Sequence, residues 1–252
     1  MLKTREGQRV PSTPLMIRRD GQWQTVDSAA FFAGRRVVLF ALPGAFTPTC
    51  SSTHVPRFNE LAPLFRANGI DEVCCLSVND PFVMERWQDE QQATALSFIA
   101  DGNGHFSQAM GMLVDKAELH FGKRSWRYSM AIRDGVIEKM FVEPERPGDP
   151  FEVSDADTMR AFICPQSRPQ PRISMFTRPG CNHCARAKAS LAAENLRFEE
   201  IRLGEGGLSL STLTAVTGES KTPQVYVDGE RVGGADELER WLSERRREKA
   251  AA

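Results

Sequence analysis

The sequence predicts an α/β protein of two domains, each with a mixed central sheet flanked by helices. In both halves of the chain, short apolar and β-branched runs alternate with helical stretches, a pattern typical of α/β folds. Residues 164–172 contain three prolines and almost no apolar side chains, which predicts an extended linker. The 252 residues then divide into a first domain at 1–165, a linker at 166–171 and a second domain at 172–252.

Four strands and three helices are expected in the first domain. The strands are short runs rich in apolar and β-branched residues, at 36–42, 72–78, 127–133 and 136–142. The helices are expected at 49–68, from about residue 81, and at 154–163. Pro56 should kink the first helix, and Ser154 should cap the last. Asp134-Gly135 predicts a hairpin turn between the last two strands.

The second domain follows a similar plan at a smaller size. Strands are expected at 173–176, 197–202 and 224–227. Helices are expected at 182–195, 208–217 and 235–247. Asp228-Gly229 predicts a turn after the last strand. Because hairpins join some of the strands, the sheet in each domain should be mixed.

Composition excludes several classes of function. With 32 Lys and Arg against 33 Asp and Glu, the formal net charge of -1 leaves no basic excess for binding nucleic acid by phosphate neutralisation. The longest apolar run, residues 37–42, is far shorter than a membrane-spanning helix requires. The N-terminus is charged and lacks the apolar stretch of a secretory signal. We therefore expect a soluble cytoplasmic protein whose six cysteines are kept as thiols.

Each half of the chain carries a cysteine in the same local setting: a strand, a loop containing Pro-Gly, and a predicted helix N-terminus. The first segment is Phe40-Ala-Leu-Pro-Gly-Ala-Phe-Thr-Pro-Thr-Cys50, and the second is Met175-Phe-Thr-Arg-Pro-Gly-Cys181-Asn-His-Cys184. Unpaired backbone N–H groups and the helix dipole favour thiolate over thiol at such positions. Because the thiolate is the nucleophile, the two sites together predict a thiol relay.

The first site resembles the peroxiredoxins. Its segment Pro43-Gly-Ala-Phe-Thr47-Pro-Thr-Cys50 matches the Pro-x-x-x-Thr-x-x-Cys signature of that family. Residues 51–54, 76–83 and 126–130 look like the type-five branch of the family, and the resemblance covers about residues 2–163. It implies that Cys50 is the peroxidatic cysteine, in a pocket completed by Thr47, Pro43 and Arg127.

These side chains suit the implied role. Attack of a thiolate on an O–O bond develops charge on the leaving oxygen, which fixed hydrogen-bond donors stabilise. Thr47 offers a hydroxyl and Arg127 an always-charged guanidinium, while Pro43 should shield the sulfur from water. The product on Cys50 is a sulfenic acid, which another thiol must reduce.

The other cysteines of the first domain are not expected to supply that thiol. Cys74 and Cys75 lie in a predicted buried strand and are interpreted as packing residues. Cys164 lies at the linker, in no motif that gives it a role. His54 falls on the same helix face as Cys50, where a hydrogen-bonded structural histidine is favoured over a general base.

The second site resembles glutaredoxin at three separate places, residues 177–188, 222–229 and 233–236, within a match over about 172–243. The two resemblances together imply two thioredoxin-fold domains. In the second domain they imply a cis peptide at Pro223 and Cys181 as the nucleophile. The implied glutathione contacts are Arg178, Thr222, Pro223, Gly234, Ala235 and Asp236.

The chain departs from glutaredoxin between its two cysteines, where Asn182 and His183 replace the usual Pro and Tyr. A tyrosine contact to glutathione is lost, and a histidine beside two sulfurs is able to change their redox balance. No metal site is expected, since no second pair of ligands follows at a matching spacing. Cys184 is either a redox partner of Cys181 or dispensable for chemistry with glutathione alone.

These observations predict a glutathione-dependent peroxidase acting on hydrogen peroxide and small alkyl hydroperoxides. Glutathione is the reducing co-substrate, and no bound cofactor is expected because no dinucleotide fingerprint follows a predicted strand. Glutathione reductase is therefore an indirect partner. A linker of about seven residues spans at most roughly 24 Å, so we expect transfer between subunits of a homo-oligomer, a dimer or tetramer. The alternatives are a thioredoxin-linked peroxidase or protein thiol–disulfide oxidoreductase, and a non-enzymatic interaction protein.

Overall fold

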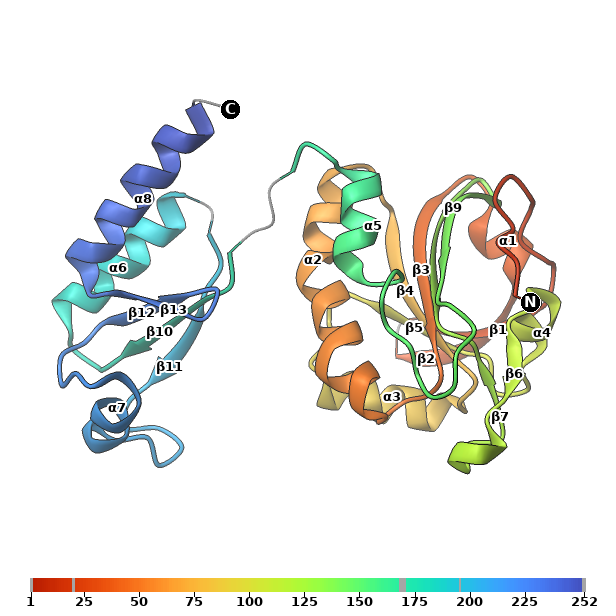
Figure 1. Cartoon of the computed structure of the whole chain (residues 1–252), viewed down its shortest axis with the longest axis horizontal. Coiled ribbons are helices and arrows are strands. Elements are labelled where there is room, and N and C mark those ends of the chain that lie inside the picture. The colour runs from red at the N-terminus through yellow and green to blue at the C-terminus, as the bar shows by residue number, and fades with distance from the viewer. Residues whose placement is uncertain (1, 20, 168–170, 195, 251–252) are drawn as a thin grey trace. The chain divides into compact units, whose positions relative to one another are not determined.

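The computed structural model describes residues 2–19, 21–167, 171–194 and 196–250. The chain divides into two compact units, Met1–Ser167 and Arg168–Ala252, which we call the first and the second unit (Figure 1). The middle of the expected linker, residues 168–170, lies outside the described residues. Within the described ranges, no helix is both long enough and apolar enough to cross a membrane.

A mixed sheet of seven strands forms the centre of the first unit, in the order β2-β1-β5-β4-β3-β8-β9. Its strands are β1 (Pro14–Arg19), β2 (Gln22–Asp27), β3 (Arg36–Leu42), β4 (Glu72–Ser77), β5 (Ser97–Ala100), β8 (Tyr128–Arg133) and β9 (Val136–Val142). Strands β3, β4 and β5 are parallel, and the remaining pairs are antiparallel. A separate ribbon joins β6 (Leu113–Asp115) to β7 (Lys123–Ser125). The mixed sheet that the sequence predicts is confirmed.

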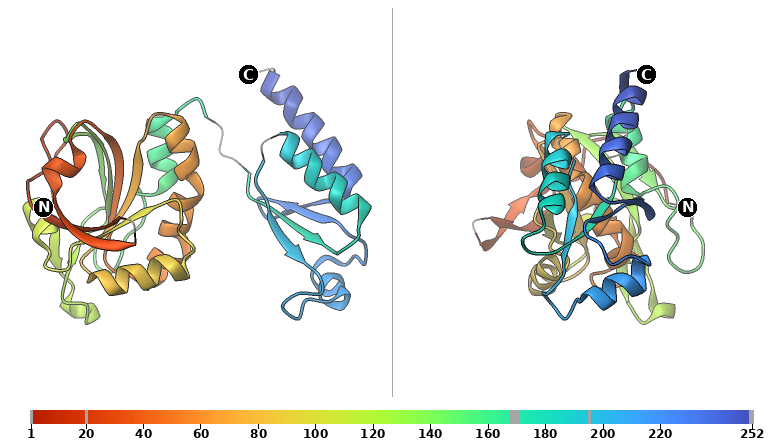
Figure 2. Two further views of the ribbon diagram at one scale, coloured as in Figure 1. Left: turned by 180° about the vertical axis from the view of Figure 1, so that it is seen from behind. Right: turned by 90° about the vertical axis from the view of Figure 1, so that its left-hand side faces the viewer.

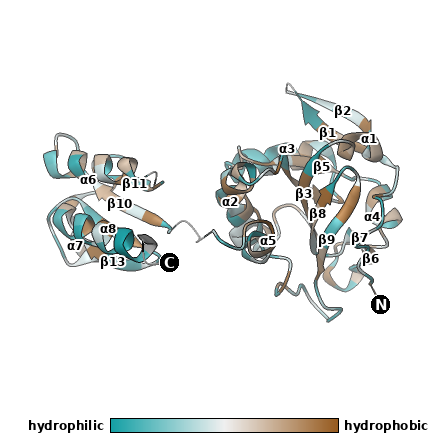
Figure 3. Ribbon diagram, turned by 90° about the horizontal axis from the view of Figure 1, so that it is seen from above, coloured by the Kyte–Doolittle hydropathy of each residue, from teal (hydrophilic) through white to brown (hydrophobic). Residues whose placement is uncertain are grey.

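Helices cover both faces of this sheet (Figure 1). They are α1 (Ser28–Phe32), α2 (Val55–Ala67), α3 (Pro81–Glu90), α4 (His105–Ala109) and α5 (Ala156–Ile163). Phe40 of β3 packs with α2, α3 and α5, whereas its neighbour Leu39 packs with α1 and α4 on the other face. The continuous apolar run of β3 therefore belongs to a strand that is buried on both faces, and β3 is among the brown, hydrophobic segments in Figure 3.

One expected helix feature is wrong. The helix expected at 49–68 is present, with a π-helical turn at Cys50–His54 that leads directly into α2. Pro56 follows this turn, and the kink expected there stays a prediction. The expected cap is the feature that differs. The last helix begins at Ala156 and is capped by Asp155, whose carboxylate accepts hydrogen bonds from backbone N–H groups of the first turn. Ser154 instead donates its hydroxyl to Glu143.

Several elements of the first unit have no counterpart among the sequence predictions, namely the hairpin β1–β2, the strand β5, the ribbon β6–β7 and the short helices α1 and α4. For strand β2, the reason that the sequence did not predict it is its exposure, because none of its residues is fully buried. Without alternating apolar and polar side chains, it lacks the periodicity that marks a strand in sequence.

The second unit has a four-stranded sheet in the order β11-β10-β12-β13. Its strands are β10 (Ile173–Thr177), β11 (Glu199–Arg202), β12 (Gln224–Val227) and β13 (Glu230–Gly233). Its helices are α6 (Asn182–Ala193), α7 (Leu210–Thr217) and α8 (Ala235–Ala250). Only β10 and β11 run parallel, so this sheet is mixed as predicted. The expected last residue of the α6 helix, Asn195, lies outside the described residues.

The second unit also packs on both faces of its sheet. Figure 2 shows α6 and α8 side by side along one face. Leu191 of α6 and Leu238 of α8 belong to the same buried cluster as Met175 of β10. On the other face, Leu213 of α7 packs with Phe176 of β10. Neighbouring residues of β10 thus pack into the clusters on opposite faces of the sheet, as they do in β3 of the first unit.

The stacked pair Phe40 and Phe58 yields a test of the first core. Their rings lie 4.1 Å apart, and Phe58 is fully buried. Phe58→Ala should lower the free energy of unfolding by about 3–5 kcal/mol, because it removes apolar burial and leaves a cavity. Phe82→Ala is the matched control, since Phe82 is 78% exposed and its loss should cost less than about 0.5 kcal/mol. Urea unfolding followed by tryptophan fluorescence measures both, and equal losses would contradict the assignment.

Candidate active sites

Segments distant in sequence meet at one edge of the sheet in the first unit. Ala41 of β3 lies opposite Tyr128 of β8, and Tyr128 lies opposite Val142 of β9. Since both strand pairs are antiparallel, the ends of β3 and β9 and the start of β8 share this edge. The loop before Cys50, the residue Arg127 and the loop that follows β9 are therefore brought together.

Arg127 lies at the centre of this edge and is 1% exposed. Its Nη2 donates to Cys50 Sγ at 3.4 Å, and its Nη1 donates to His54 Nδ1 at 3.0 Å. Its Nε donates to Asp149 Oδ1 at 3.1 Å, and Nη2 also pairs with Asp149 Oδ2. Because all three guanidinium nitrogens are engaged, the surrounding residues fix the direction in which Arg127 presents its charge to the sulfur.

The hydrogen bonds of His54 determine its protonation. Ring atom Nε2 lies 3.2 Å from the carbonyl oxygen of Ser154, which can only accept, so Nε2 carries the proton. Nδ1 must then be the acceptor for Arg127, and the ring is neutral. Burial, followed by the charge of Arg127, lowers the pKa of His54 well below its usual value. The expected hydrogen bonding of His54 is confirmed.

Glu143 anchors the loop that carries Asp149. This glutamate is 2% exposed, and its carboxylate accepts four hydrogen bonds of 2.8–2.9 Å. The donors are the backbone N–H groups of Glu152, Val153 and Ser154 and the hydroxyl of Ser154. These dipoles compensate the loss of hydration of the buried carboxylate. Glu143 therefore ties the start of this loop to its end.

Phe151 of the same loop completes the enclosure. Its ring centroid lies 5.3 Å from the guanidinium carbon of Arg127 and 4.8 Å from the centroid of the His54 ring. Neither Asp149 nor Glu143 was a sequence prediction. No motif or spacing links them to Cys50, and only the return of β9 to the active edge brings them close.

Cys50 is fully buried, and its environment corrects the sequence argument about its pKa. Burial has the largest influence and raises the pKa of the Cys50 thiol above its ordinary value, whereas a lowered pKa was expected. Arg127, the Thr47 hydroxyl and the Gly44 backbone act in the lowering direction, and Asp149 acts in the raising direction. The expectation was wrong because it considered only the helix N-terminus. It left out the loss of hydration that a buried thiolate suffers, which a sequence does not reveal.

The loop between β3 and Cys50 contains the two other expected pocket residues. Thr47 donates its hydroxyl to the carbonyl oxygen of Gly44 at 2.9 Å, and Pro43 is buried. The Asn79 side chain accepts a hydrogen bond of 3.0 Å from the backbone N–H of Ala45, so the loop is tied to the end of β4. Pro43, Thr47, Cys50 and Arg127 thus belong to one edge of the first unit.

In the second unit, Cys181 caps α6 and forms a disulfide with Cys184, with their Cα atoms 5.2 Å apart. The backbone N–H of Cys184 donates to Cys181 Sγ at 3.2 Å. The hydroxyl of Thr222 donates to the same sulfur at 3.5 Å. The peptide bond between Thr222 and Pro223 is cis, as the resemblance implied. Unlike Cys50, Cys181 is only half-buried.

A cavity of about 460 Å³ lies beside these residues. Five of the six expected glutathione contacts line it, namely Thr222, Pro223, Gly234, Ala235 and Asp236. Arg178 is exposed and is not part of the lining. The lining includes His183, which the sequence singled out beside the two cysteines, and adds three basic side chains that the sequence did not single out, Arg186, Lys221 and Arg231. These groups make the cavity suited to a ligand with carboxylates.

Two acidic residues of this cavity are already engaged. Arg186 forms ion pairs with Asp236 and Glu239. Glu237 accepts a hydrogen bond of 2.9 Å from the backbone N–H of Gly234. Backbone N–H groups of Glu237 itself and of Gly234 lower the pKa of the Glu237 carboxyl. A ligand carboxylate at the start of α8 would therefore compete with Glu237.

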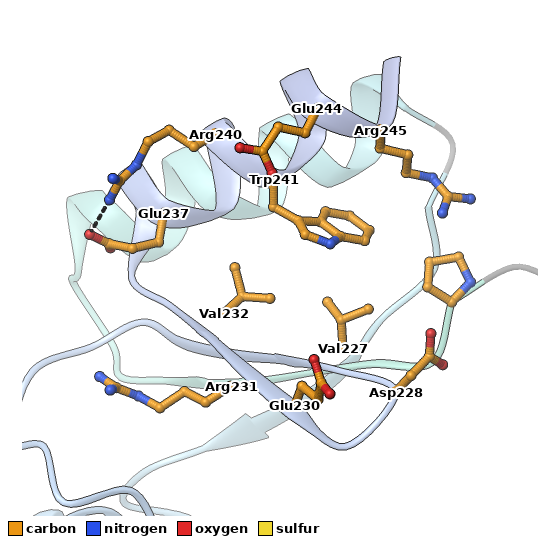
Figure 4. A pocket seen from close by; sticks show the side chains of 11 residues that line it. Val227, Asp228, Glu230, Arg231, Val232, Glu237, Arg240, Trp241, Glu244 and Arg245 are labelled. Atoms are coloured by element: carbon orange, nitrogen blue, oxygen red, sulfur yellow. Dashed lines mark hydrogen bonds and ion pairs between the residues drawn. The ribbon is translucent and has the colours of Figure 1, made fainter. Parts of the chain in front are cut away.

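A second cavity of the second unit, of about 600 Å³, lies between α8 and the β12–β13 turn (Figure 4). Trp241, Val227 and Val232 form its apolar part, and charged side chains of both signs surround it. Its lining shares Arg231, Val232 and Glu237 with the cavity beside Cys181 but includes neither Thr222 nor Pro223.

The remaining cysteines are buried in the first unit. Cys74 and Cys75 are fully enclosed in the two cores on opposite faces of β4, and burial raises the pKa of both thiols. Cys164 is buried after the end of α5. Among the residues that the structure describes, no group of three or more His, Cys, Asp or Glu side chains is arranged to hold a metal ion.

The neutral state of His54 predicts a pH-dependent stability. Its pKa is lowered by folding, so the unfolded chain takes up the proton first, and stability should be complete above about pH 7 and fall below about pH 6.5. Compared with His54→Asn, the unmodified protein should lose about 1 kcal/mol more between about pH 7.5 and 5.5. Urea unfolding at a series of pH values measures this difference. Parallel pH curves for the two proteins would contradict the assignment.

Comparisons with known proteins agree with this geometry. The Redoxin family model matches residues 5–159, and the Glutaredoxin model matches residues 173–232. The sequence is 50% identical to the hybrid peroxiredoxin hyPrx5 of Haemophilus influenzae, over 96% of this chain and 100% of that protein. It is 55% identical to peroxiredoxin sll1621 of Synechocystis sp., over 56% of this chain and 77% of that protein.

A solved structure gives the same result for the first unit. Reduced Prx3 of Vibrio vulnificus in complex with hydrogen peroxide is 39% identical and superimposes with a TM-score of 0.60, covering 64% of this chain and 99% of that chain. The two thioredoxin-fold domains that the sequence resemblances implied are confirmed. The chain belongs to the peroxiredoxin family of thiol peroxidases, as a hybrid member in which a redoxin domain is followed by a glutaredoxin domain.

Proposed function

We propose that this thiol peroxidase depends on glutathione and reduces hydrogen peroxide and small alkyl hydroperoxides at Cys50. The observation that carries the proposal is the hydrogen bond from Arg127 Nη2 to Cys50 Sγ, made inside a buried site. Such a donor is fixed before the reaction begins, so it stabilises developing charge without reorganisation. The hydrogen peroxide bound to Prx3 of Vibrio vulnificus supports a small peroxide as the substrate.

In the first step the Cys50 thiolate attacks one peroxide oxygen. The S–O bond forms as the O–O bond breaks, and the leaving oxygen takes up a proton to become water or an alcohol. Cys50 is oxidised by two electrons to the sulfenic acid, and the peroxide is reduced. Arg127 and the Thr47 hydroxyl stabilise charge during the transfer, while buried Pro43 limits the access of water.

Glutathione then completes the cycle in three exchanges. One glutathione condenses with the Cys50 sulfenic acid, releasing water and leaving a mixed disulfide. The Cys181 thiolate attacks the glutathione sulfur and frees the Cys50 thiol. A second glutathione attacks the Cys181 mixed disulfide and leaves as glutathione disulfide. The Cys184 N–H and the Thr222 hydroxyl donate to the Cys181 sulfur and so lie beside the atom that attacks.

The glutathione site is assigned to the cavity beside Cys181. Thr222 and Pro223 present backbone to an extended peptide, and Gly234, Ala235 and Asp236 receive the γ-glutamyl end. Arg178, which lies outside the lining, is proposed as an outer contact for a carboxylate. The site needs no bound cofactor, since glutathione is a substrate that glutathione reductase regenerates. A cytoplasmic location and a homo-oligomer, a dimer or tetramer, complete the proposal.

The disulfide between Cys181 and Cys184 favours one alternative. A dithiol pair of this kind can exchange with protein disulfides, so the second unit would then act as a protein thiol–disulfide oxidoreductase or accept electrons from thioredoxin. In that case Cys184 is required, whereas the glutathione route needs only Cys181.

A coupled assay separates these routes by following NADPH consumption with peroxide, glutathione and glutathione reductase. Cys50→Ser should reduce turnover by about a hundredfold or more, because it removes the nucleophile. Cys181→Ser should do the same, and Cys184→Ser should keep most of the turnover. Cys164→Ser is the matched control and should change little, since Cys164 lies after the end of α5. Turnover that survives in Cys50→Ser would refute the mechanism, and dependence on Cys184 would favour the dithiol route.

The role of Arg127 predicts a change in both rate and pH dependence. Arg127→Gln should slow peroxide reduction by about a hundredfold or more, since it removes a fixed charged donor. The pKa of the Cys50 thiol should rise further, so the pH–rate curve should move to higher pH. Arg146→Gln is the control, because Arg146 is an exposed member of an ion pair with Glu152. A slower enzyme with an unmoved pH curve would contradict the charge effect.

A further inference from the structure

The carboxylate of Asp149 holds two of the three nitrogens of the Arg127 guanidinium. Oδ1 accepts from Nε at 3.1 Å, and Oδ2 pairs with Nη2. Nη2 is also the atom that donates to Cys50 Sγ at 3.4 Å. Arg–carboxylate pairs with two parallel hydrogen bonds fix the plane of the guanidinium. The direction of the Nη2–H bond toward the sulfur therefore depends on Asp149.

Asp149 also changes the net charge around the Cys50 sulfur. Four titratable or charged groups influence or adjoin Cys50: Arg127 from the start of β8, Asp149 from the loop after β9, His54 from the π-helical turn, and Cys75 from β4. His54 is neutral by its hydrogen bonds, and the Cys75 thiol is fully buried. The cation of Arg127 and the anion of Asp149 then cancel, so the enclosed site has no net charge before Cys50 ionises.

Asp149 is itself positioned by the anchored loop. Glu143 fixes residues 152–154 through four hydrogen bonds, and Phe151 lies against both Arg127 and His54. The side chain of Asp149 remains 27% exposed while that of Arg127 is 1% exposed. The carboxylate thus closes the outer side of the guanidinium, and the sulfur lies on its inner side.

We propose that Asp149 is a positioning residue for the peroxidase reaction, which orients Arg127 toward Cys50 and balances its charge. This inference rests on the proposed role of Arg127 at Cys50. It has two consequences of opposite sign. Orientation by Asp149 speeds the attack of each thiolate on peroxide, whereas its negative charge opposes formation of the thiolate. A residue that only stabilised the loop would produce no such opposition.

The test replaces Asp149 with Asn in the full chain and measures two quantities. The rate at which iodoacetamide alkylates Cys50, read from the mass of its peptide, should reach half its maximum at a pH lower by about half a unit or more. The rate of a single turnover with hydrogen peroxide, compared above the half-maximum pH of both proteins, should fall about tenfold or more. The alkylation measurement needs no peroxidase activity, so its outcome is separate from that of the proposed function.

Glu152→Gln is the matched control, because Glu152 lies in the same loop and forms an ion pair with Arg146 instead of Arg127. It should change neither quantity. Asp149→Glu, which keeps the charge and alters only its reach, should keep the alkylation curve of the unmodified protein and slow the single turnover. If Asp149→Asn fails to fold, as circular dichroism would show, the Asp149→Glu result decides. An unmoved or raised alkylation curve in Asp149→Asn, a shifted curve in Asp149→Glu, or peroxide rates within about twofold of the unmodified protein would overturn the proposal.

Discussion

The buried guanidinium of Arg127 is the interaction on which the active edge of the first unit depends. A charge that is 1% exposed is tolerated only where hydrogen bonds and a counter-ion compensate the loss of water. Asp149 supplies the counter-ion, His54 supplies a neutral acceptor, and Cys50 accepts a hydrogen bond from Nη2. Each of these residues is held in a state that suits the others. His54 must stay neutral to accept from Arg127, and its proton must therefore lie on the nitrogen that faces Ser154.

The sheet order explains how this cluster arises. Strand β8 lies between β3 and β9, so one edge of the sheet collects the end of β3, the start of β8 and the end of β9. The chain after β9 then returns across this edge, and Glu143 secures it with its side-chain carboxylate. The residues that surround Cys50 therefore come from up to about a hundred positions away in the sequence. This is the usual outcome when long-range strand pairing places a site at the end of a sheet.

Each unit has a strand, a loop and then a cysteine near a helix start, yet the two cysteine sulfurs differ in burial. Cys50 is fully buried, and burial raises the pKa of its thiol against the effect of Arg127. Cys181 is half-buried and accepts a hydrogen bond from Thr222, which lines a cavity with basic side chains. A small peroxide can enter an enclosed site, whereas a tripeptide with two carboxylates requires an open one. The difference in burial follows the difference in the size of the proposed substrates.

The sequence by itself determined the two-unit organisation, the mixed sheets and the positions of both cysteine segments, because these depend on local periodicity and on short motifs. It also identified Thr47 and Arg127 through the family signature. Only the tertiary structure decided the partners of Arg127, the protonation of His54 and the raised pKa of the Cys50 thiol. These properties arise from burial and from contacts between residues far apart in the chain. No pattern within a single segment contains that information, since desolvation and ion pairing exist only after the strands have paired.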